Sequence, residues 1–97
     1  MKRLQLRSPA QIDYMEAIAW YEVRRPGLGR EFEAEVEEML ERIRRHPEHF
    51  SKATPTVRKA RLPRFKYNIY FTVEGDEVGV LAIYHPSRNP DTLRRRF

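Results

Sequence analysis

Two stretches of the sequence carry apolar residues at helical spacing, and a short turn containing proline and glycine joins them. In the first stretch the apolar residues recur at offsets of 4, 7, 8 and 11: Ala10, Tyr14, Ala17, Ile18 and Tyr21. The second stretch has the same offsets: Phe32, Val36, Met39, Leu40 and Ile43. This spacing places one apolar stripe along an α-helix. Because only "RRPGLG" (24–29) separates the stripes, the sequence predicts two helices packed as an antiparallel hairpin.

The first of these helices has more apolar residues than one stripe needs. The additional ones are Ile12, Met15, Ala19 and Trp20, so we expect this helix to be covered on more than one side. Ser8 and Pro9 come directly before the stripe. Ser8 is predicted to cap the helix, and Pro9 to occupy the first turn, where proline is tolerated.

The rest of the chain shows the alternation of apolar and polar residues that is typical of β-strands. The alternating stretches are "RLQLR" (3–7), "VRKARL" (57–62) and "RFKYNIYFTV" (64–73). In the last of them one face is predicted to hold Phe65, Tyr67, Ile69, Phe71 and Val73, and the other Arg64, Lys66, Asn68, Tyr70 and Thr72. Gly75 marks a hairpin turn. The strand that follows, "VGVLAIY" (78–84), is apolar on both faces and is therefore expected in the interior of the sheet.

The order of these elements predicts an α+β fold, β-α-α-β-β-β, in which the helical hairpin packs on a small antiparallel sheet. The 97 residues are expected to form one domain, 1–97. The chain has no cysteine, which excludes disulfides and cysteine-based metal sites. No window has the roughly 18 apolar residues of a membrane span, so we expect a soluble protein in the cytoplasm with no membrane partner.

Positive charge is concentrated in the second half of the chain. Residues 1–50 hold nine Lys and Arg against ten Asp and Glu, whereas residues 51–97 hold ten against four. This asymmetry favours a polyanion or an acidic partner. The residues predicted to bind such a target are Arg58, Lys59, Arg61, Arg64, Lys66, Tyr70, Tyr84 and Arg88. Cations interleaved with tyrosines suit phosphates and stacked bases, but Lys and Arg also protect an ordinary exposed sheet from aggregation.

The stretch "AIYHPSRNP" (82–90) ends the last strand with His85 and Arg88. With Arg61 or Lys66 nearby, a histidine base and an arginine could cleave RNA without a metal, using the 2′-hydroxyl as nucleophile. The alternative is a histidine that only bonds to a turn. His46 and His49, at the predicted end of the second helix, are interpreted as structural. No metal or cofactor site is predicted.

Two long stretches, 17–50 and 57–90, and the order of the elements are similar to the RelE/ParE superfamily of type II toxin–antitoxin toxins. The ending "LAIYH..R.P" resembles the ParE-type branch in particular. The resemblance implies a small basic toxin that a cognate antitoxin neutralises by wrapping the helical hairpin and the sheet. A hetero-oligomer with the antitoxin is therefore expected, whereas a homo-oligomer is not implied. The candidate antitoxin-binding residues are Trp20 and Leu28.

The superfamily contains two mechanisms, and the resemblance leaves both open. RelE-like members cleave mRNA on the ribosome, and for that mechanism the candidate catalytic residues are Arg58, Arg61, Arg64, His85 and Arg88. ParE-like members inhibit DNA gyrase and need no catalytic residue. The chain ends in "TLRRRF" and lacks the terminal tyrosine of the RelE pattern, which favours the ParE-like mechanism. A third hypothesis is a non-toxic nucleic-acid-binding module.

Overall fold

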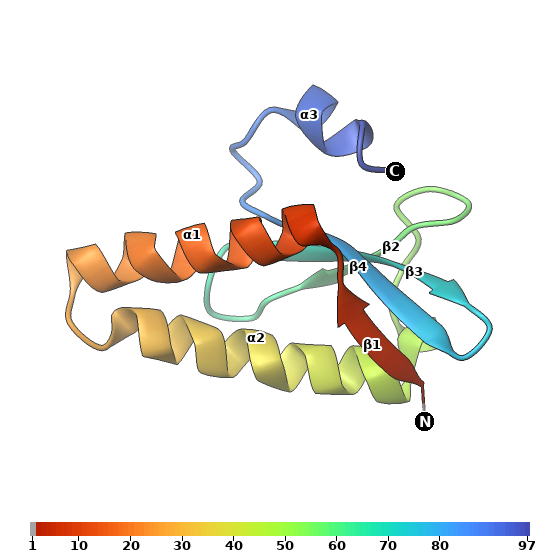
Figure 1. Ribbon diagram of the computed structural model, residues 1–97, viewed down its shortest axis with the longest axis horizontal. Coiled ribbons are helices and arrows are strands. Elements are labelled where there is room, and N and C mark those ends of the chain that lie inside the picture. The colour runs from red at the N-terminus through yellow and green to blue at the C-terminus, as the bar shows by residue number, and fades with distance from the viewer. Residues whose placement is uncertain (1) are drawn as a thin grey trace.

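The computed structural model describes residues 2–97 and contains four strands, two long helices and two short ones (Figure 1). The elements are β1 (Arg3–Leu6), α1 (Ser8–Arg24), α2 (Leu28–Arg45), the 3₁₀ turn η1 (Pro47–His49), β2 (Arg58–Arg61), β3 (Asn68–Glu74), β4 (Glu77–Tyr84) and α3 (Pro90–Arg94). The predicted α+β fold is confirmed. None of the helices within residues 2–97 combines the length and the apolar character that crossing a membrane requires.

The sheet has the strand order β1-β4-β3-β2, so β4 lies in the interior as predicted. β2 and β4 are antiparallel to β3, but β1 is parallel to β4. The sheet is therefore mixed, where the sequence analysis expected it to be antiparallel. A parallel pair needs a long connection between its strands, and here that connection contains both long helices, β2 and β3. Local alternation cannot reveal such a pairing.

The core lies between the helical pair and one face of the sheet. Both predicted stripes face it: Phe32, Val36 and Ile43 are fully buried, and the α1 stripe supplies Ala10 and Ala17. The face predicted for "RFKYNIYFTV" is also correct, since its odd-numbered residues all belong to this core or pack against it. The expectation that α1 is covered on more than one side is wrong for this chain alone, because all four additional apolar residues are exposed: Ile12, Met15, Ala19 and Trp20.

Helix α1 begins one residue earlier than the sequence suggested. Ser8 is the first helical residue, Arg7 occupies the cap position, and no side chain caps the helix. The prediction that Ser8 is the cap is wrong, because the sheet sets the boundary: the Arg7 N–H still donates to the Val80 carbonyl at 3.0 Å. The Gln11 side chain donates to the Leu6 carbonyl at 2.9 Å, which ties the first helical turn to the end of β1.

The segment before β3 is a turn, although its residues alternate. β3 starts at Asn68, so Arg64 and Lys66 lie outside the strand, and their predicted place on the outer sheet face is wrong. The Arg64 N–H donates to Glu35 at 2.9 Å, and its guanidinium binds Glu31. Both acceptors belong to α2, so Arg64 lies against the helical pair. Pro63 starts this turn, and the two-residue alternation continues through it.

A β-bulge changes which residues of β4 face the helices. Tyr70 pairs with Ala82 and Phe71 with Val80, so Leu81 is an extra residue between them. Such a residue shifts the alternation of the strand. As a result Val80 and Ile83 both join the core between sheet and helices, whereas Leu81 and Tyr84 are buried outside that core.

Gly29 lies at a close approach of the two long helices. A Cβ at this position would lie 2.7 Å from the Ile18 carbonyl oxygen and 3.1 Å from the Glu22 Cβ. The Glu22 carboxylate accepts the Gly27 and Gly29 N–H groups at 2.9 and 3.0 Å. It therefore satisfies free donors at the start of α2, a role usually taken by a cap residue.

We expect Gly29→Ala to lower the free energy of unfolding by about 1–3 kcal/mol, the usual effect of overpacking. At an open helical position the same change would stabilise the protein by roughly 1 kcal/mol. The sign of the change in the free energy of unfolding therefore shows whether Gly29 lies in close contact with α1. Equilibrium urea unfolding measures the free energy of unfolding of both proteins. Arg30→Ala, at the exposed neighbouring position, is the control and should stay within about 0.5 kcal/mol of the wild type. A stabilised Gly29→Ala protein would contradict the close approach.

Candidate functional site

The C-terminal segment is anchored by one buried carboxylate, that of Asp13 in α1. Asp13 is 3% exposed and accepts the Ile83 N–H at 3.0 Å. It also binds the guanidinium of Arg88 at 3.4 Å, and that of Arg96 through both terminal nitrogens, Nη1 and Nη2. The bond to Asp13 raises the pKa of Arg96 above its ordinary value. We call Asp13, Arg88 and Arg96 the Asp13 network.

The Asp13 network compensates for the shortness of β1. That strand pairs with β4 only as far as Val80, which leaves the second half of β4 without a neighbour on this side. Buried backbone groups that lack partners are costly. Asp13 accepts the N–H of Ile83, and Arg96 donates to the carbonyl of Leu81 at 3.3 Å. Side chains thus replace part of the missing strand.

The same arginines cover Tyr84. The guanidinium carbons of Arg88 and Arg96 lie 4.1 and 5.0 Å from the centre of its ring, which is cation–π geometry. Tyr84 is buried, and its hydroxyl has no hydrogen-bond partner within residues 2–97. The predicted target-binding residues Tyr84 and Arg88 are therefore in contact, but Tyr84 lies beneath the arginines and not on the surface.

Beside the network lies a hollow of about 330 Å³, which we call the aromatic hollow. Its lining comes from α1, the turn before β3 and the end of β4: Trp20, Tyr21, Tyr67, His85, Ser87 and Arg88. The rings of Tyr67 and His85 meet edge to face at 5.3 Å, and those of Trp20 and Tyr21 at 5.0 Å. Burial raises the pKa of Tyr67, so its hydroxyl stays neutral. The hollow combines an apolar wall with one cation, Arg88.

His85 is oriented by the turn that follows it. Its Nδ1 accepts the Ser87 N–H at 3.0 Å and lies 2.7 Å from the Ser87 hydroxyl. A neutral imidazole has one acceptor nitrogen, so in the neutral ring the proton is on Nε2. This is the turn-bonded histidine that the sequence analysis weighed against a catalytic base.

The outer face of the sheet, opposite the helical pair, holds a second hollow of about 610 Å³, which we call the basic groove. Its charged lining residues are Arg7, Lys52, Arg58, Glu74 and Arg96. Beside it, Lys59 and Arg61 are exposed on β2 and pair in register with Tyr70 and Asn68. Arg96 and Phe97 line the groove, so the C-terminal segment forms one wall of it. The ring of Phe97 also lies 5.5 Å from that of Tyr70 on β3.

The arginines proposed as catalytic are dispersed over the molecule. Arg58 donates to the Phe50 carbonyl at 2.6 Å, Arg64 binds Glu31, and Arg88 binds Asp13. Arg61 is exposed on β2, and Lys66 is exposed in the turn before β3. Of the proposed catalytic set, only His85 and Arg88 share a hollow.

Sequence reasoning missed several residues of these surfaces. Asp13 occupies a position of the α1 stripe, three residues after Ala10 and four before Ala17, and a carboxylate there indicates a buried partner. The short helix α3 was also missed. Its start has the typical pattern of Asn89, whose side chain accepts the Asp91 N–H, followed by Pro90 in the first turn. Leu28, a candidate antitoxin-binding residue, is half-buried against the core.

A helical hairpin packed on one face of a small mixed sheet is the fold that the resemblance to the RelE/ParE superfamily implies. The family model described as "ParE toxin of type II toxin-antitoxin system, parDE" matches residues 4–90. The chain belongs to this family, so the prediction of a ParE-like toxin from the RelE/ParE superfamily is confirmed, and a toxin of this kind has an antitoxin partner.

One similar solved structure is described as the chromosomal ParDE TA system from P. aeruginosa. It aligns with a TM-score of 0.77 and 21% identity over 88% of this chain and 96% of that chain. At this identity the likeness concerns the fold. No curated protein matches the chain.

Proposed function

We propose that this toxin acts by binding DNA gyrase in the cytoplasm and blocking its activity, which arrests growth until the cognate antitoxin neutralises it. The observation that carries the proposal is the dispersal of the candidate catalytic residues. Metal-free cleavage of RNA needs a base and cations around one phosphate. Here Arg58, Arg64 and Arg88 each hold another part of the fold.

The hydrogen bonding of His85 also favours a toxin that binds its target over a toxin that cleaves RNA. A general base needs a free lone pair within hydrogen-bond reach of the nucleophile. The Nδ1 lone pair of His85 is taken by Ser87, and the ring packs edge to face with that of Tyr67. To act as a base through either nitrogen, His85 would have to give up the bond to Ser87.

For the contact with gyrase we propose the exposed cations next to the basic groove. Lys59 and Arg61 extend from β2 at an edge of the sheet, and Lys66 follows in the next turn. Cations on one surface attract an acidic partner surface and speed the encounter. The surface is separate from the Asp13 network, so its residues can be changed without releasing the C-terminal segment.

A supercoiling assay with purified gyrase and relaxed plasmid tests the proposal. We expect the toxin to inhibit supercoiling, and the double variant Lys59→Glu, Arg61→Glu to need at least about tenfold more toxin for the same inhibition. Arg30→Glu, an exposed position on α2, is the matched control and should inhibit like the wild type.

Normal supercoiling at saturating toxin would overturn the gyrase proposal. Primer extension on mRNA after toxin induction then distinguishes the alternative. Codon-positioned cuts that are lost in His85→Ala would assign the toxin to the RelE-like mechanism.

A further inference from the structure

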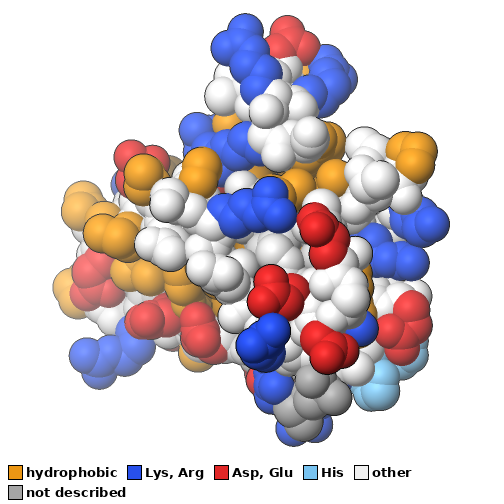
Figure 2. Space-filling view, turned by 45° about the vertical axis from the view of Figure 1, so that its right-hand side comes forward, with side chains coloured by type: hydrophobic (Ala, Val, Ile, Leu, Met, Phe, Trp, Pro, Cys, Tyr) orange, Lys and Arg blue, Asp and Glu red, His pale blue; other side chains and the backbone are white. Residues whose placement is uncertain are grey.

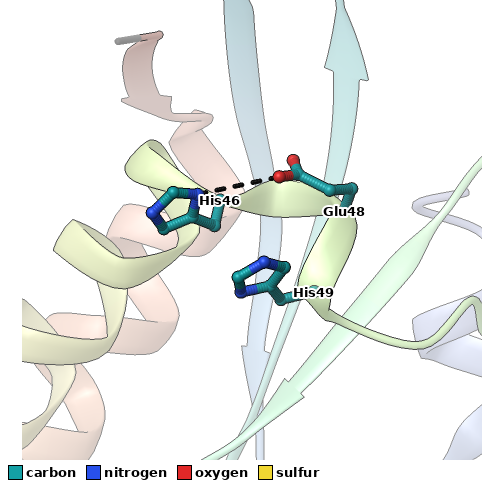
Figure 3. A group of neighbouring side chains, drawn as sticks. All are labelled: His46, Glu48 and His49. Carbon is teal, nitrogen blue, oxygen red and sulfur yellow. Dashed lines mark ion pairs between the residues drawn. The ribbon is translucent and has the colours of Figure 1, made fainter.

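Three potential metal ligands lie together directly after α2, in the segment His46-Pro47-Glu48-His49 (Figure 3). His46, Glu48 and His49 are all exposed, and each offers a ligand atom within 4.8 Å of the others. The distance from His46 Nδ1 to the Glu48 Oε1 is 3.7 Å. The sequence analysis interpreted the two histidines as structural and placed no metal here. The geometry points to a different role.

The backbone conformation of η1 brings the two imidazoles together. In a 3₁₀ turn the side chains at positions i and i+3 eclipse each other, and His46 and His49 have this spacing. Their rings stack with centroids 4.7 Å apart and planes inclined by 11°. Figure 3 shows Glu48 on the same side of the turn, with its carboxylate directed toward His46.

The turn is held rigidly, so the ligands are already gathered before a metal arrives. The His46 N–H donates to the Arg42 carbonyl at 2.9 Å, which continues α2 into the turn. The His49 N–H donates to the His46 carbonyl at 3.1 Å, and Pro47 is buried. The lone pairs of two stacked, nearly parallel rings do not converge on one point, so at least one imidazole must rotate about its side-chain torsions to bind the metal. Zinc–ligand bonds of about 2.0–2.2 Å at tetrahedral angles place ligand atoms roughly 3.4 Å apart, which is close to the His46–Glu48 distance.

The electrostatic surroundings also suit a cation. The C-terminus of a helix carries a partial negative charge, and the cluster follows the C-terminus of α2. Three arginines of the last turn, Arg42, Arg44 and Arg45, oppose a cation. The guanidinium of Arg42 lies 5.9 Å from the centre of the Phe50 ring. The guanidiniums of Arg44 and Arg45 both bind the Glu41 carboxylate, at 2.6 and 3.1 Å. Their charge is therefore partly neutralised by a partner of their own.

We propose that His46, Glu48 and His49 form a zinc site. Two imidazoles and one carboxylate suit zinc and similar transition metals, whereas magnesium and calcium prefer oxygen ligands alone. Three protein ligands leave one tetrahedral position for water. The site lies at the end of α2 away from the hairpin turn, and it shares no residue with the aromatic hollow or the basic groove. It is thus independent of how the toxin inhibits its target.

Calorimetric titration of the tag-free protein with zinc chloride tests the site. We expect one zinc ion per chain. His46→Gln, Glu48→Gln and His49→Gln should each weaken binding at least about tenfold, because even residues that only hydrogen-bond to a metal ligand contribute roughly 10–100-fold to metal affinity. The control His85→Gln should bind zinc like the wild type, and magnesium chloride should produce no binding heat.

Circular dichroism will show that the variants are folded, which is expected because all three side chains are exposed. The site is refuted if the wild-type protein takes up no zinc. It is also refuted if His46→Gln and His49→Gln bind zinc as tightly as the wild type, or if His85→Gln loses it.

Discussion

Asp13→Asn is expected to lower the free energy of unfolding by about 3–5 kcal/mol, the usual cost of removing one partner from a buried ion pair. The change leaves the guanidiniums of Arg96 and Arg88 without their anion, and Arg96 is itself mostly buried. It also weakens the acceptor of the Ile83 N–H, at the point where β4 has no neighbouring strand. For a domain whose total stability is roughly 5–15 kcal/mol, this is a large share.

Equilibrium urea unfolding measures the effect, and Asp91→Asn is the matched control. Asp91 also pairs with an arginine, Arg94, at 2.6 Å, but both side chains are about two-thirds exposed. An exposed pair contributes about 0–1 kcal/mol, so the control should stay close to the wild type. Equal losses in the two variants would contradict the role given to the buried carboxylate.

A second readout separates anchoring from general stability. The Asp13 network is what holds the segment after β4 against α1. In Asp13→Asn we therefore expect limited proteolysis to cut between His85 and Phe97 under conditions where the rest of the chain resists. Proteolysis that attacks the whole chain at once would show that the network contributes to the core and does not specifically anchor the end.

The helical hairpin and the interior strand could be predicted because local patterns determine them. A stripe at offsets of 4, 7, 8 and 11 is compatible with few structures other than a helix, and residues 10–21 and 32–43 both show it. An apolar run without alternation, as in 78–84, needs cover on both faces. The parallel pairing of β1 with β4 was missed, because it joins residues more than 70 positions apart.

The functional surfaces were predicted less completely, for reasons that particular residues illustrate. Arg64 and Lys66 continue the alternation of β3 into a turn, so the pattern assigned them to a face that they do not occupy. Asp13 was overlooked because its partner Arg96 is 83 residues away. His46 and His49 were correctly placed at a helix end, but the sequence does not show that the turn stacks their rings.

Of the five large hydrophobic side chains that are exposed within residues 2–97, four lie on α1. Ile12, Met15, Trp20 and Val23 are between 49% and 82% exposed. At helical spacing Ile12, Met15 and Val23 lie on the side of α1 opposite its buried stripe, whereas Trp20 lies at the edge of the stripe. Figure 2 shows hydrophobic side chains gathered over the hairpin-turn end of the helical pair, at the left of the view. An exposed apolar patch of this kind indicates an interaction surface, and the antitoxin is the partner that we propose for it.

Trp20 is the residue of this patch with the greatest expected effect on antitoxin binding. It borders both the patch and the aromatic hollow, and the Arg24 guanidinium lies 3.2 Å from the centre of its ring. A side chain already held in place loses little entropy on binding, and tryptophan is enriched among interface hot spots. We expect Trp20→Ala to weaken the complex by about 2–4 kcal/mol, which corresponds to roughly 30- to 1,000-fold in Kd.

Calorimetric titration of the toxin with its cognate antitoxin gives the Kd, and survival of cells that express both proteins gives a second readout. Because Trp20 is half exposed, the variant should fold and remain toxic when expressed alone, while the antitoxin protects less well. Asp76→Ala, in the exposed turn between β3 and β4, is the control and should leave the Kd unchanged. If Trp20→Ala binds the antitoxin as tightly as the wild type, the apolar side of α1 has another purpose, and the antitoxin must neutralise the toxin through a different surface.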